Sequence, residues 1–181
     1  KIDIYNIKKT KKIFLDFKPD FVFHLAAQAL VKKSYINPLE TYKSNTFGTL
    51  SILECLKNLK NKCVVVLITS DKSYKNLEIK RGYKENDLLG GIDPYSSSKA
   101  CAELVIQTYV NSFFKSKKNI TLAVARAGNV IGGGDWSKDR LIPDCVKSWS
   151  KNKKVVLRNP NSTRPWQHVL EPLSGYLVLS L

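Results

Sequence analysis

The sequence has little of what metal sites and disulfide frameworks require. It contains two histidines and four cysteines in 181 residues, and the cysteines stand at positions 55, 63, 101 and 145. None forms a Cys-x-x-Cys pair, and none has a histidine at the spacing of a metal site. We therefore expect no metal centre. We predict buried free thiols, which are typical of a reducing compartment such as the cytoplasm.

Three further absences narrow the class of protein. No apolar run approaches the roughly 20 residues that span a bilayer, so we expect no membrane segment. The net charge of +15 would suit nucleic acid, but only five of the 30 basic residues are arginines, and no aromatics are interleaved with the scattered lysines. We predict no nucleic-acid partner. Methionine is absent, also at position 1, and we expect a piece of a longer protein.

What is present is an alternation of short apolar runs and longer amphipathic segments. The runs at 21–27, 64–68 and 120–125 are typical of parallel strands covered on both faces. Strand and helix in alternation predict a parallel sheet with right-handed crossovers, which is the α/β class. We expect helices at 7–17, 37–56, 95–114 and 141–149, short strands at 155–158 and 166–170, and a last helix from Pro172.

Polar and small residues follow the three predicted strands. They are Ala26–Gln28, Ser70–Lys72 and Ala127–Asn129. The carboxyl ends of parallel strands meet at one edge of a sheet, where open α/β folds bind their ligands. Packing under a helix would explain the small residues equally well. Asn45, within the apolar stripe of the second helix, needs a buried hydrogen-bond partner.

The helix that begins near Tyr95 carries the clearest chemical signal. Tyr95 and Lys99 stand at positions i and i+4, on one face of the helix. A lysine ammonium and a helix N-terminus both favour the phenolate, so the pair can accept a proton from an alcohol. A half-buried tyrosine over a surface lysine is the alternative. The long segment 73–94 before this helix has the length of a functional loop. The glycine-rich segment 128–136 lacks the spacing of a dinucleotide loop.

Together these motifs resemble the extended short-chain dehydrogenase/reductase superfamily. The matching residues are His24-Leu25-Ala26-Ala27-Gln28, Asn45 with Gly48-Thr49, Thr69-Ser70-Asp71 and Tyr95-x-x-x-Lys99. Within it the chain is similar to the CDP-glucose 4,6-dehydratases, through Lys72 after Asp71, Gly90-Gly91-x-Asp93-Pro94-Tyr95, Ala125 to Trp136, Leu141-Ile142-Pro143-Asp144 and Arg158 to Pro172.

The resemblance implies a partial Rossmann-like, doubly wound parallel sheet with part of a smaller C-terminal substrate domain. We expect a truncated NAD-binding domain at 1–128 and a partial substrate-binding region, interleaved with it, at 129–181. The family's glycine-rich turn for the NAD pyrophosphate has no match in this sequence. A sheet without its first strands exposes an unpaired edge. We therefore expect the isolated chain to be inactive and poorly soluble, and the full-length protein to be a homo-oligomer.

The reaction that the resemblance implies is the conversion of CDP-glucose to CDP-4-keto-6-deoxyglucose by internal hydride transfer through bound NAD, in deoxysugar and O-antigen biosynthesis. Tyr95 would be the base for the sugar 4-hydroxyl and Lys99 its electrostatic partner. Ser70 would bond the 4-oxygen, and Asp71 would protonate the leaving 6-hydroxyl. Lys72 would remove the C5 proton as a neutral amine, or else only anchor substrate charge.

The resemblance also implies two sets of binding residues. Those toward NAD are Asp3, Ile4, Leu25, Ala26, Ala27, Gln28, Ser44, Asn45, Thr69, Tyr95 and Lys99. Those toward the nucleotide sugar are Ser70, Asn129, Leu141, Ile142, Arg158 and Arg164, where arginine forks suit the diphosphate. Asn129 and the two arginines have a loop-stabilising role as their alternative. Two other functions stay open: another NAD-dependent sugar-nucleotide epimerase or dehydratase, and a fragment without catalysis.

Overall fold

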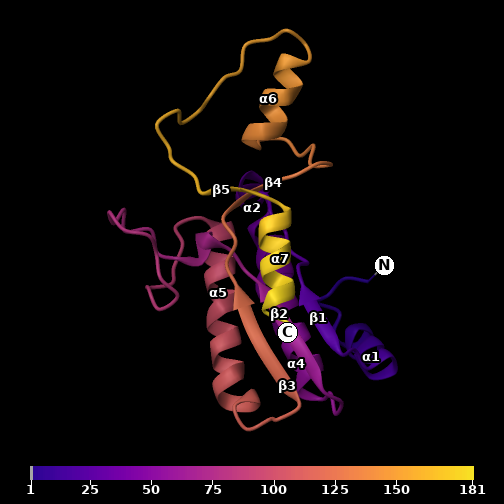
Figure 1. Cartoon of the computed structure of the whole chain (residues 1–181). Coiled ribbons are helices and arrows are strands. Elements are labelled where there is room, and N and C mark those ends of the chain that lie inside the picture. The colour runs from indigo at the N-terminus through magenta and orange to yellow at the C-terminus, as the bar shows by residue number, and fades with distance from the viewer. Residues whose placement is uncertain (1) are drawn as a thin grey trace. The chain divides into compact units, whose positions relative to one another are not determined.

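The computed structural model describes residues 2–181, and its centre is a three-stranded parallel sheet in the order β1-β2-β3. This confirms the α/β class (Figure 1). The first predicted strand ends at His24 rather than Ala27, because the backbone of Gln28 bonds to the Asn45 side chain instead of to a strand. The strands are β1 at Phe21–His24, β2 at Cys63–Ile68 and β3 at Ile120–Ala125.

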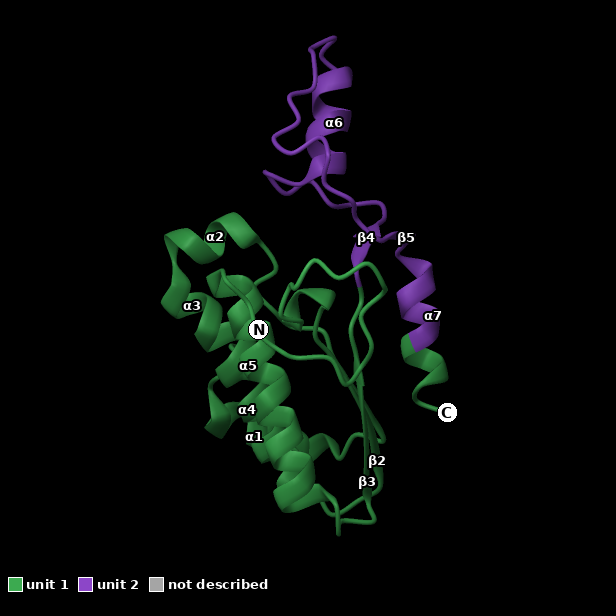
Figure 2. Ribbon diagram, turned by 90° about the vertical axis from the view of Figure 1, so that its left-hand side faces the viewer, with its two compact units in different colours: residues 1–127, 176–181 green, residues 128–175 purple. Residues whose placement is uncertain are grey.

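Three helices lie on one side of this sheet, as Figure 2 shows. They are α1 at Ile7–Phe17, α4 at Gly48–Lys57 and α5 at Pro94–Tyr109, which a π-helical turn, η3 at Val110–Phe114, continues. The predicted helices at 7–17 and 95–114 are therefore confirmed. Asn6 caps α1 by accepting a hydrogen bond from the Lys9 amide, and the chain leaves this helix through Lys18 in the left-handed conformation.

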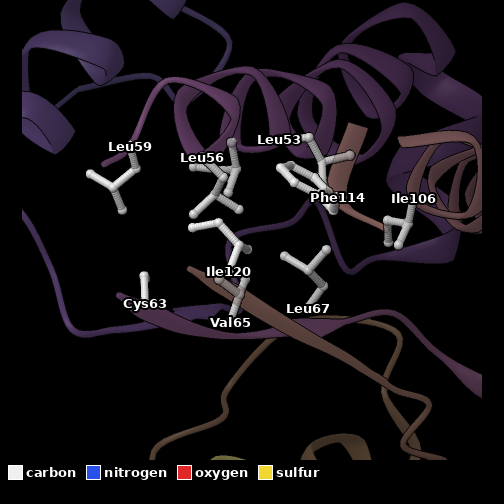
Figure 3. Close-up of a cluster of buried hydrophobic side chains, with 10 residues drawn as sticks. Leu53, Leu56, Leu59, Cys63, Val65, Leu67, Ile106, Phe114 and Ile120 are labelled. Carbon is white, nitrogen blue, oxygen red and sulfur yellow. The ribbon is translucent and has the colours of Figure 1, made fainter. Parts of the chain in front are cut away.

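The core lies between these helices and strand β2 (Figure 3). Leu53 and Leu56 of α4 meet Val65 and Leu67 of β2, and all four side chains are fully buried. Alternate residues of β2 point to this core because side chains along a strand alternate between the two faces of its sheet. Phe14 of α1 packs against the same cluster. The apolar contact fixes where the carboxyl end of β2 lies relative to helix α5.

Short elements connect the strands. Helix α3 at Pro38–Tyr42 is capped by the side chain of Asn37, with Pro38 at the first helical position. The helix that we predicted from 37 to 56 is confirmed as a continuous helical stretch of α3, a π-helical turn around Asn45, and α4. The additional elements are α2 at Val31–Ile36, α3 at Pro38–Tyr42, the π-helical turn η1 at Lys43–Phe47 and the 3₁₀ turn η2 at Asp71–Ser73.

Gly128–Gly175 form a second compact unit, whereas Tyr176–Leu181 cluster with the residues up to Ala127. In the second unit β4 and β5 pair in parallel, with Asn129 opposite Trp166. The strand predicted at 155–158 is wrong, since this segment has no strand partner and Val156 is 87% exposed. The elements are β4 at Asn129–Ile131, α6 at Leu141–Trp149, β5 at Trp166–His168 and α7 at Leu170–Val178, which crosses the boundary of the units.

All four cysteines are free thiols, and Cys55, Cys63 and Cys145 are buried as predicted, whereas Cys101 is half-buried. Burial raises the pKa of the Cys55 and Cys63 thiols to about 11, so both stay protonated at neutral pH. Across residues 2–181, no histidine, cysteine and carboxylate side chains gather in a group that could hold a metal ion. No helix described there has the length and apolar character needed to cross a bilayer.

Candidate active site

Helix α5 brings Lys99 to the carboxyl end of strand β2. The helix begins at Pro94, and Asp93 caps it by accepting a hydrogen bond of 3.0 Å from the Ser96 amide. Lys99 is 6% exposed, and its Nζ donates to the carbonyl oxygen of Ile68, the last residue of β2, at 3.5 Å. Tyr95 is half-buried one turn earlier on the same helix. Lys99 therefore lies beside the turn that carries Ser70, and Tyr95 precedes it by one turn of the same helix.

The start of α5 depends on a close approach by Gly91. A Cβ atom at this position would lie 2.4 Å from the Cβ of Ser96 and 2.5 Å from the amide nitrogen of Ser97. Any side chain there would push the first turn of the helix away. Glycine is therefore required for the placement of Tyr95, which belongs to that turn.

The turn after β2 holds the predicted hydroxyl and carboxylate together. The Ser70 hydroxyl donates to the Asp71 carboxylate at 3.0 Å and accepts from the Lys72 amide at 3.2 Å. The Asp71 amide donates to the carbonyl oxygen of Ala127, just beyond β3. This bond links the turn to the neighbouring strand end. Ser70 is buried, whereas Asp71 and Lys72 are half-buried.

The electrostatics at this edge are dominated by the buried Lys99 amine. Burial lowers the pKa of Lys99 to about 8, and the carboxylate of Glu103, one turn further along α5, partly opposes this effect. His24, at the end of β1, lies close to Thr49, with 3.2 Å between Nε2 and the threonine hydroxyl. Burial and the Lys99 charge lower its pKa to about 4. At neutral pH, then, Lys99 is mostly charged and His24 is neutral.

Asn45 finds the buried partners that its position requires. It is 2% exposed, and its side-chain oxygen accepts a hydrogen bond from the Gln28 amide at 2.8 Å. Its side-chain nitrogen donates to the Gln28 carbonyl and, at 2.9 Å, to the hydroxyl of Ser98, the neighbour of Lys99. Asn45 sits in a π-helical turn, a feature often found at functional sites. It ties the end of β1 to helix α5.

The other residues predicted toward NAD lie in the same unit. Ile4 packs on Gly48, the first residue of α4. Gln28 is buried and bonds to the Thr41 hydroxyl through its side chain, so its amide group has a structural role. The Thr69 hydroxyl donates to Glu103 at 2.5 Å. Of the remaining five, Asp3, Leu25 and Ala26 are exposed, and Ala27 and Ser44 are half-buried.

The residues predicted toward the nucleotide sugar lie, apart from Ser70, in the second unit. Asn129 begins β4, and Leu141 and Ile142 begin α6. Arg158 is exposed and pairs with the Asp139 carboxylate at 3.4 Å. Arg164 is exposed as well and donates to the carbonyl oxygen of Thr163. Contact of these residues with a substrate stays a prediction.

Sequence reasoning missed two charged residues at the edge described above, Glu103 and Arg126. They form a buried ion pair, with 2.7 Å between the Arg126 Nε and a carboxylate oxygen of Glu103. One available signal was the position of Glu103, four residues after Lys99 on the same helix face. A charged side chain on the covered face of a helix needs a partner of opposite charge.

Comparison with known proteins decides the family. The family model for GDP-mannose 4,6 dehydratase matches residues 1–179. The chain belongs to this family. Over 98% of its length it is 54% identical to the CDP-glucose 4,6-dehydratase of Salmonella typhimurium, of which it covers 51%. The chain thus spans about half the length of the curated relatives that it matches.

Solved structures of two dTDP-glucose 4,6-dehydratases share the fold. The dTDP-glucose 4,6-dehydratase of Bacillus anthracis, in complex with NAD, has a TM-score of 0.80 at 26% identity, and the match covers 99% of this chain and 53% of that one. The enzyme DesIV of Streptomyces venezuelae, a dTDP-glucose 4,6-dehydratase studied as a double mutant with NAD and DAU bound, has a TM-score of 0.84 at 23% identity over the same shares. Both relatives were solved with NAD bound, so the residues of this chain can be compared with what NAD would require.

The residues of this chain fit one end of NAD, the nicotinamide and its ribose. The Lys99 amine is buried with one long hydrogen bond, to Ile68, so it retains donors for ribose hydroxyls. Tyr95 lies on the same face of α5, and the small residues Ala26 and Ala27 follow β1. The sequence holds no glycine-rich turn for the pyrophosphate. The described residues are thus compatible with the nicotinamide end of NAD, and contact with this cofactor stays a prediction.

Proposed function

We propose that the full-length protein is an NAD-dependent CDP-glucose 4,6-dehydratase, which converts CDP-glucose to CDP-4-keto-6-deoxyglucose. The observation that carries the proposal is the meeting of two elements: the Lys99 amine reaches the last carbonyl of β2, and the Ser70–Asp71 hydroxyl and carboxylate follow directly. The identity to the Salmonella enzyme supports the choice of CDP-glucose. A role in deoxysugar and O-antigen biosynthesis, a cytoplasmic location and a homo-oligomeric state belong to the same proposal.

The proposed roles are those that the family resemblance implies, and the positions of Lys99 and Ser70 support them. Tyr95 removes the proton from the sugar 4-hydroxyl, and the Lys99 charge stabilises the phenolate that does so. The Ser70 hydroxyl orients the 4-oxygen. NAD bound beside Lys99 would supply the hydride acceptor for C4 and the hydride donor for C6. Asp71 protonates the 6-hydroxyl as it leaves. The half-buried Lys72 takes the proton from C5 and returns a proton to C5 when C6 receives the hydride.

The test is the conversion of CDP-glucose by the full-length protein with NAD, followed by mass spectrometry and NMR. We expect a product lighter by one water that carries a ketone at C4, and loss of this product in Asp71→Asn. An epimerase would instead give CDP-galactose of unchanged mass, which would refute the dehydratase. The control is Asp87→Asn, which removes a carboxylate on the exposed loop, where it pairs with Arg81.

The role of Lys72 has its own test. In Lys72→Ala we expect 4-oxidation to persist and the exchange of the C5 hydrogen with deuterated solvent to be lost, because no base remains for that proton. Lys75→Ala is the matched control, since Lys75 is an exposed lysine three residues further along the same segment. Normal exchange in Lys72→Ala would leave Lys72 with substrate binding alone.

We further propose that the isolated 181-residue chain is inactive and poorly soluble. Strand β1 is an outer strand of the described sheet, and its Phe21 is 54% exposed and its Phe23 36%. Phe17, at the end of α1, is 77% exposed. Large exposed apolar side chains beside an open strand edge favour association. Calorimetry of the isolated chain with NAD is the test, and micromolar affinity would contradict the proposal.

A further inference from the structure

Glu103 and Arg126 form an ion pair next to the turn that carries Ser70 and Asp71. Glu103 is 2% exposed, and both of its oxygens are used by Arg126: Nε lies 2.7 Å from Oε1, and Nη2 lies 2.9 Å from Oε2. Glu103 belongs to α5, and Arg126 directly follows strand β3. The pair therefore joins the helix of Tyr95 and Lys99 to the strand next to β2.

The same carboxylate also holds the turn after β2 at both of its ends. Its Oε1 accepts from the Thr69 hydroxyl at 2.5 Å and lies 3.4 Å from the Ser73 hydroxyl, which itself donates to the Ser70 carbonyl oxygen at 2.7 Å. Thr69 and Ser73 flank the three residues Ser70–Lys72. A single buried anion on α5 thus fixes both ends of the proposed catalytic turn.

Arg126 extends this network to the long loop before α5. Its guanidinium lies over the ring of Tyr74, 4.6 Å from the centroid, and donates to the Glu85 carbonyl oxygen at 3.0 Å. Tyr74 in turn stacks on Tyr83, with 5.0 Å between the ring centroids. The arginine therefore touches the loop and helix α5 directly, and it acts on the turn through Glu103.

Stability alone is a weak reason for such a pair. Replacing a buried ion pair by apolar residues of similar volume is often neutral or stabilising, because taking two charges out of water is costly. A fork of parallel hydrogen bonds, on the other hand, fixes geometry more tightly than apolar contacts do. In addition, the Glu103 charge raises the pKa of Lys99 against the effect of burial. Both effects act on the proposed catalytic groups.

We propose that Glu103 and Arg126 are positioning residues, which hold the Ser70–Lys72 turn in register with the Tyr95–Lys99 face of helix α5. The consequence for turnover rests on the proposed function, whereas the consequence for the turn itself does not. Neither residue contacts the reacting atoms in this assignment. They act through Thr69, Ser73 and the backbone of the turn.

The decisive experiment compares stability with rate in the full-length protein. The double variant Glu103→Leu/Arg126→Met removes both charges together, so neither ion is left unpaired. The hydroxyls of Thr69 and Ser73 keep the carbonyl oxygens of Ala125 and Ser70 as acceptors, so we expect a melting temperature close to that of the wild type. We expect kcat to fall by about 10-fold to 100-fold, because a misplacement of about 1 Å carries a cost of that size. KM should change by less than about threefold, since the variant removes no proposed substrate contact. Hydrogen exchange at the amides of residues 70–74 should become faster.

The control and a milder variant keep the test decisive. The control is Glu54→Gln. Like Glu103, Glu54 accepts hydrogen bonds from a cation and a hydroxyl, those of Lys57 and Tyr109, but it lies toward the far ends of α4 and α5. This substitution should change neither kcat nor the exchange of residues 70–74. If the double variant does not fold, Thr69→Val removes only the threonine arm, and it should still speed the exchange and lower kcat. Wild-type kcat with unchanged exchange in the folded variants would overturn the proposal. Faster exchange in the variants, together with a wild-type protein that does not dehydrate CDP-glucose, would instead refute the proposed function alone.

Discussion

The buried Lys99 amine should make the protein less stable than it would be with an apolar residue at this position. Burial lowers the pKa of Lys99 from 10.5 to about 8. This difference, at about 1.4 kcal/mol for each pKa unit, corresponds to about 3 kcal/mol of unfavourable free energy for the charged amine in the folded state. Substituting Lys99→Met removes the charge and keeps a side chain of similar length. We expect the variant to gain about 2 to 3 kcal/mol at pH 7, after the loss of the long bond to Ile68.

The pH dependence of this gain has a definite sign. Below pH 8 the lysine is protonated in both the folded and the unfolded state, so the full penalty is present. Between pH 8 and 10.5 the folded protein releases this proton while the unfolded chain still holds it, and wild-type stability rises relative to the variant. Above pH 10.5 the amine is neutral in both states and the difference vanishes. The gain of Lys99→Met is therefore largest at pH 7 and disappears at high pH.

Urea unfolding of the full-length wild type and Lys99→Met, repeated from pH 7 to 10.5, measures this effect. Lys115→Met serves as the control, because Lys115 is an exposed lysine near the other end of the same helical segment, where a substitution should change stability by no more than about 0.5 kcal/mol. The variant should also be inactive. An unchanged or lowered midpoint for Lys99→Met at pH 7 would refute the reasoning, as would a gain that persists at pH 10.5.

Two further substitutions test how the site is positioned and supported. Gly91→Ala should lower kcat by about 10-fold or more, because the added Cβ would displace the first turn of α5. Gly82→Ala is the control and should have normal kinetics, since nothing lies within 4 Å of a Cβ at this position. Steady-state kinetics of both variants measure this difference, and equal kcat values would contradict the prediction. Leu53→Ala should lower the free energy of unfolding by about 3 to 5 kcal/mol, since this side chain is fully buried. Leu104 is 53% exposed, so Leu104→Ala should lower it by less than about 1 kcal/mol. Denaturant unfolding compares the two variants, and similar losses would argue against the described core.

The pattern of apolar residues within each segment was enough to predict the strands and helices that pack together in the core. Strands β2 and β3 agree with the predicted 64–68 and 120–125 to within one residue, because continuous apolar runs mark strands that lie under helices. The N-cap at Asn37 was also predictable, since it depends only on residues within one turn. Tyr95 and Lys99 share a helix face for the same local reason.

What failed depends on partners far along the chain. Val156 and Leu157 have the composition of a strand, but no neighbouring strand pairs with them. Conversely, β4 lies in a glycine-rich segment without a strand pattern, and it forms because Asn129–Ile131 pair with residues 166–168. A strand is stabilised by its neighbours, so its existence is a property of the fold rather than of the segment. The Glu103–Arg126 pair escaped prediction for the same reason, since 23 residues separate the two.

Three costly features gather at the carboxyl edge of the sheet. Lys99 is buried with its charge, Glu103 and Arg126 are taken out of water together, and Gly91 packs directly on the start of α5. Each is unfavourable or neutral for stability by itself, and an apolar core could replace the first two. Perturbed charged groups that converge in this way are typical of catalytic sites, where stability is lost in exchange for fixed geometry. If Lys99→Met and the Glu103→Leu/Arg126→Met double variant are both as stable as the wild type or more so, yet both are slow, stability cannot explain the presence of these charges, and the reaction can.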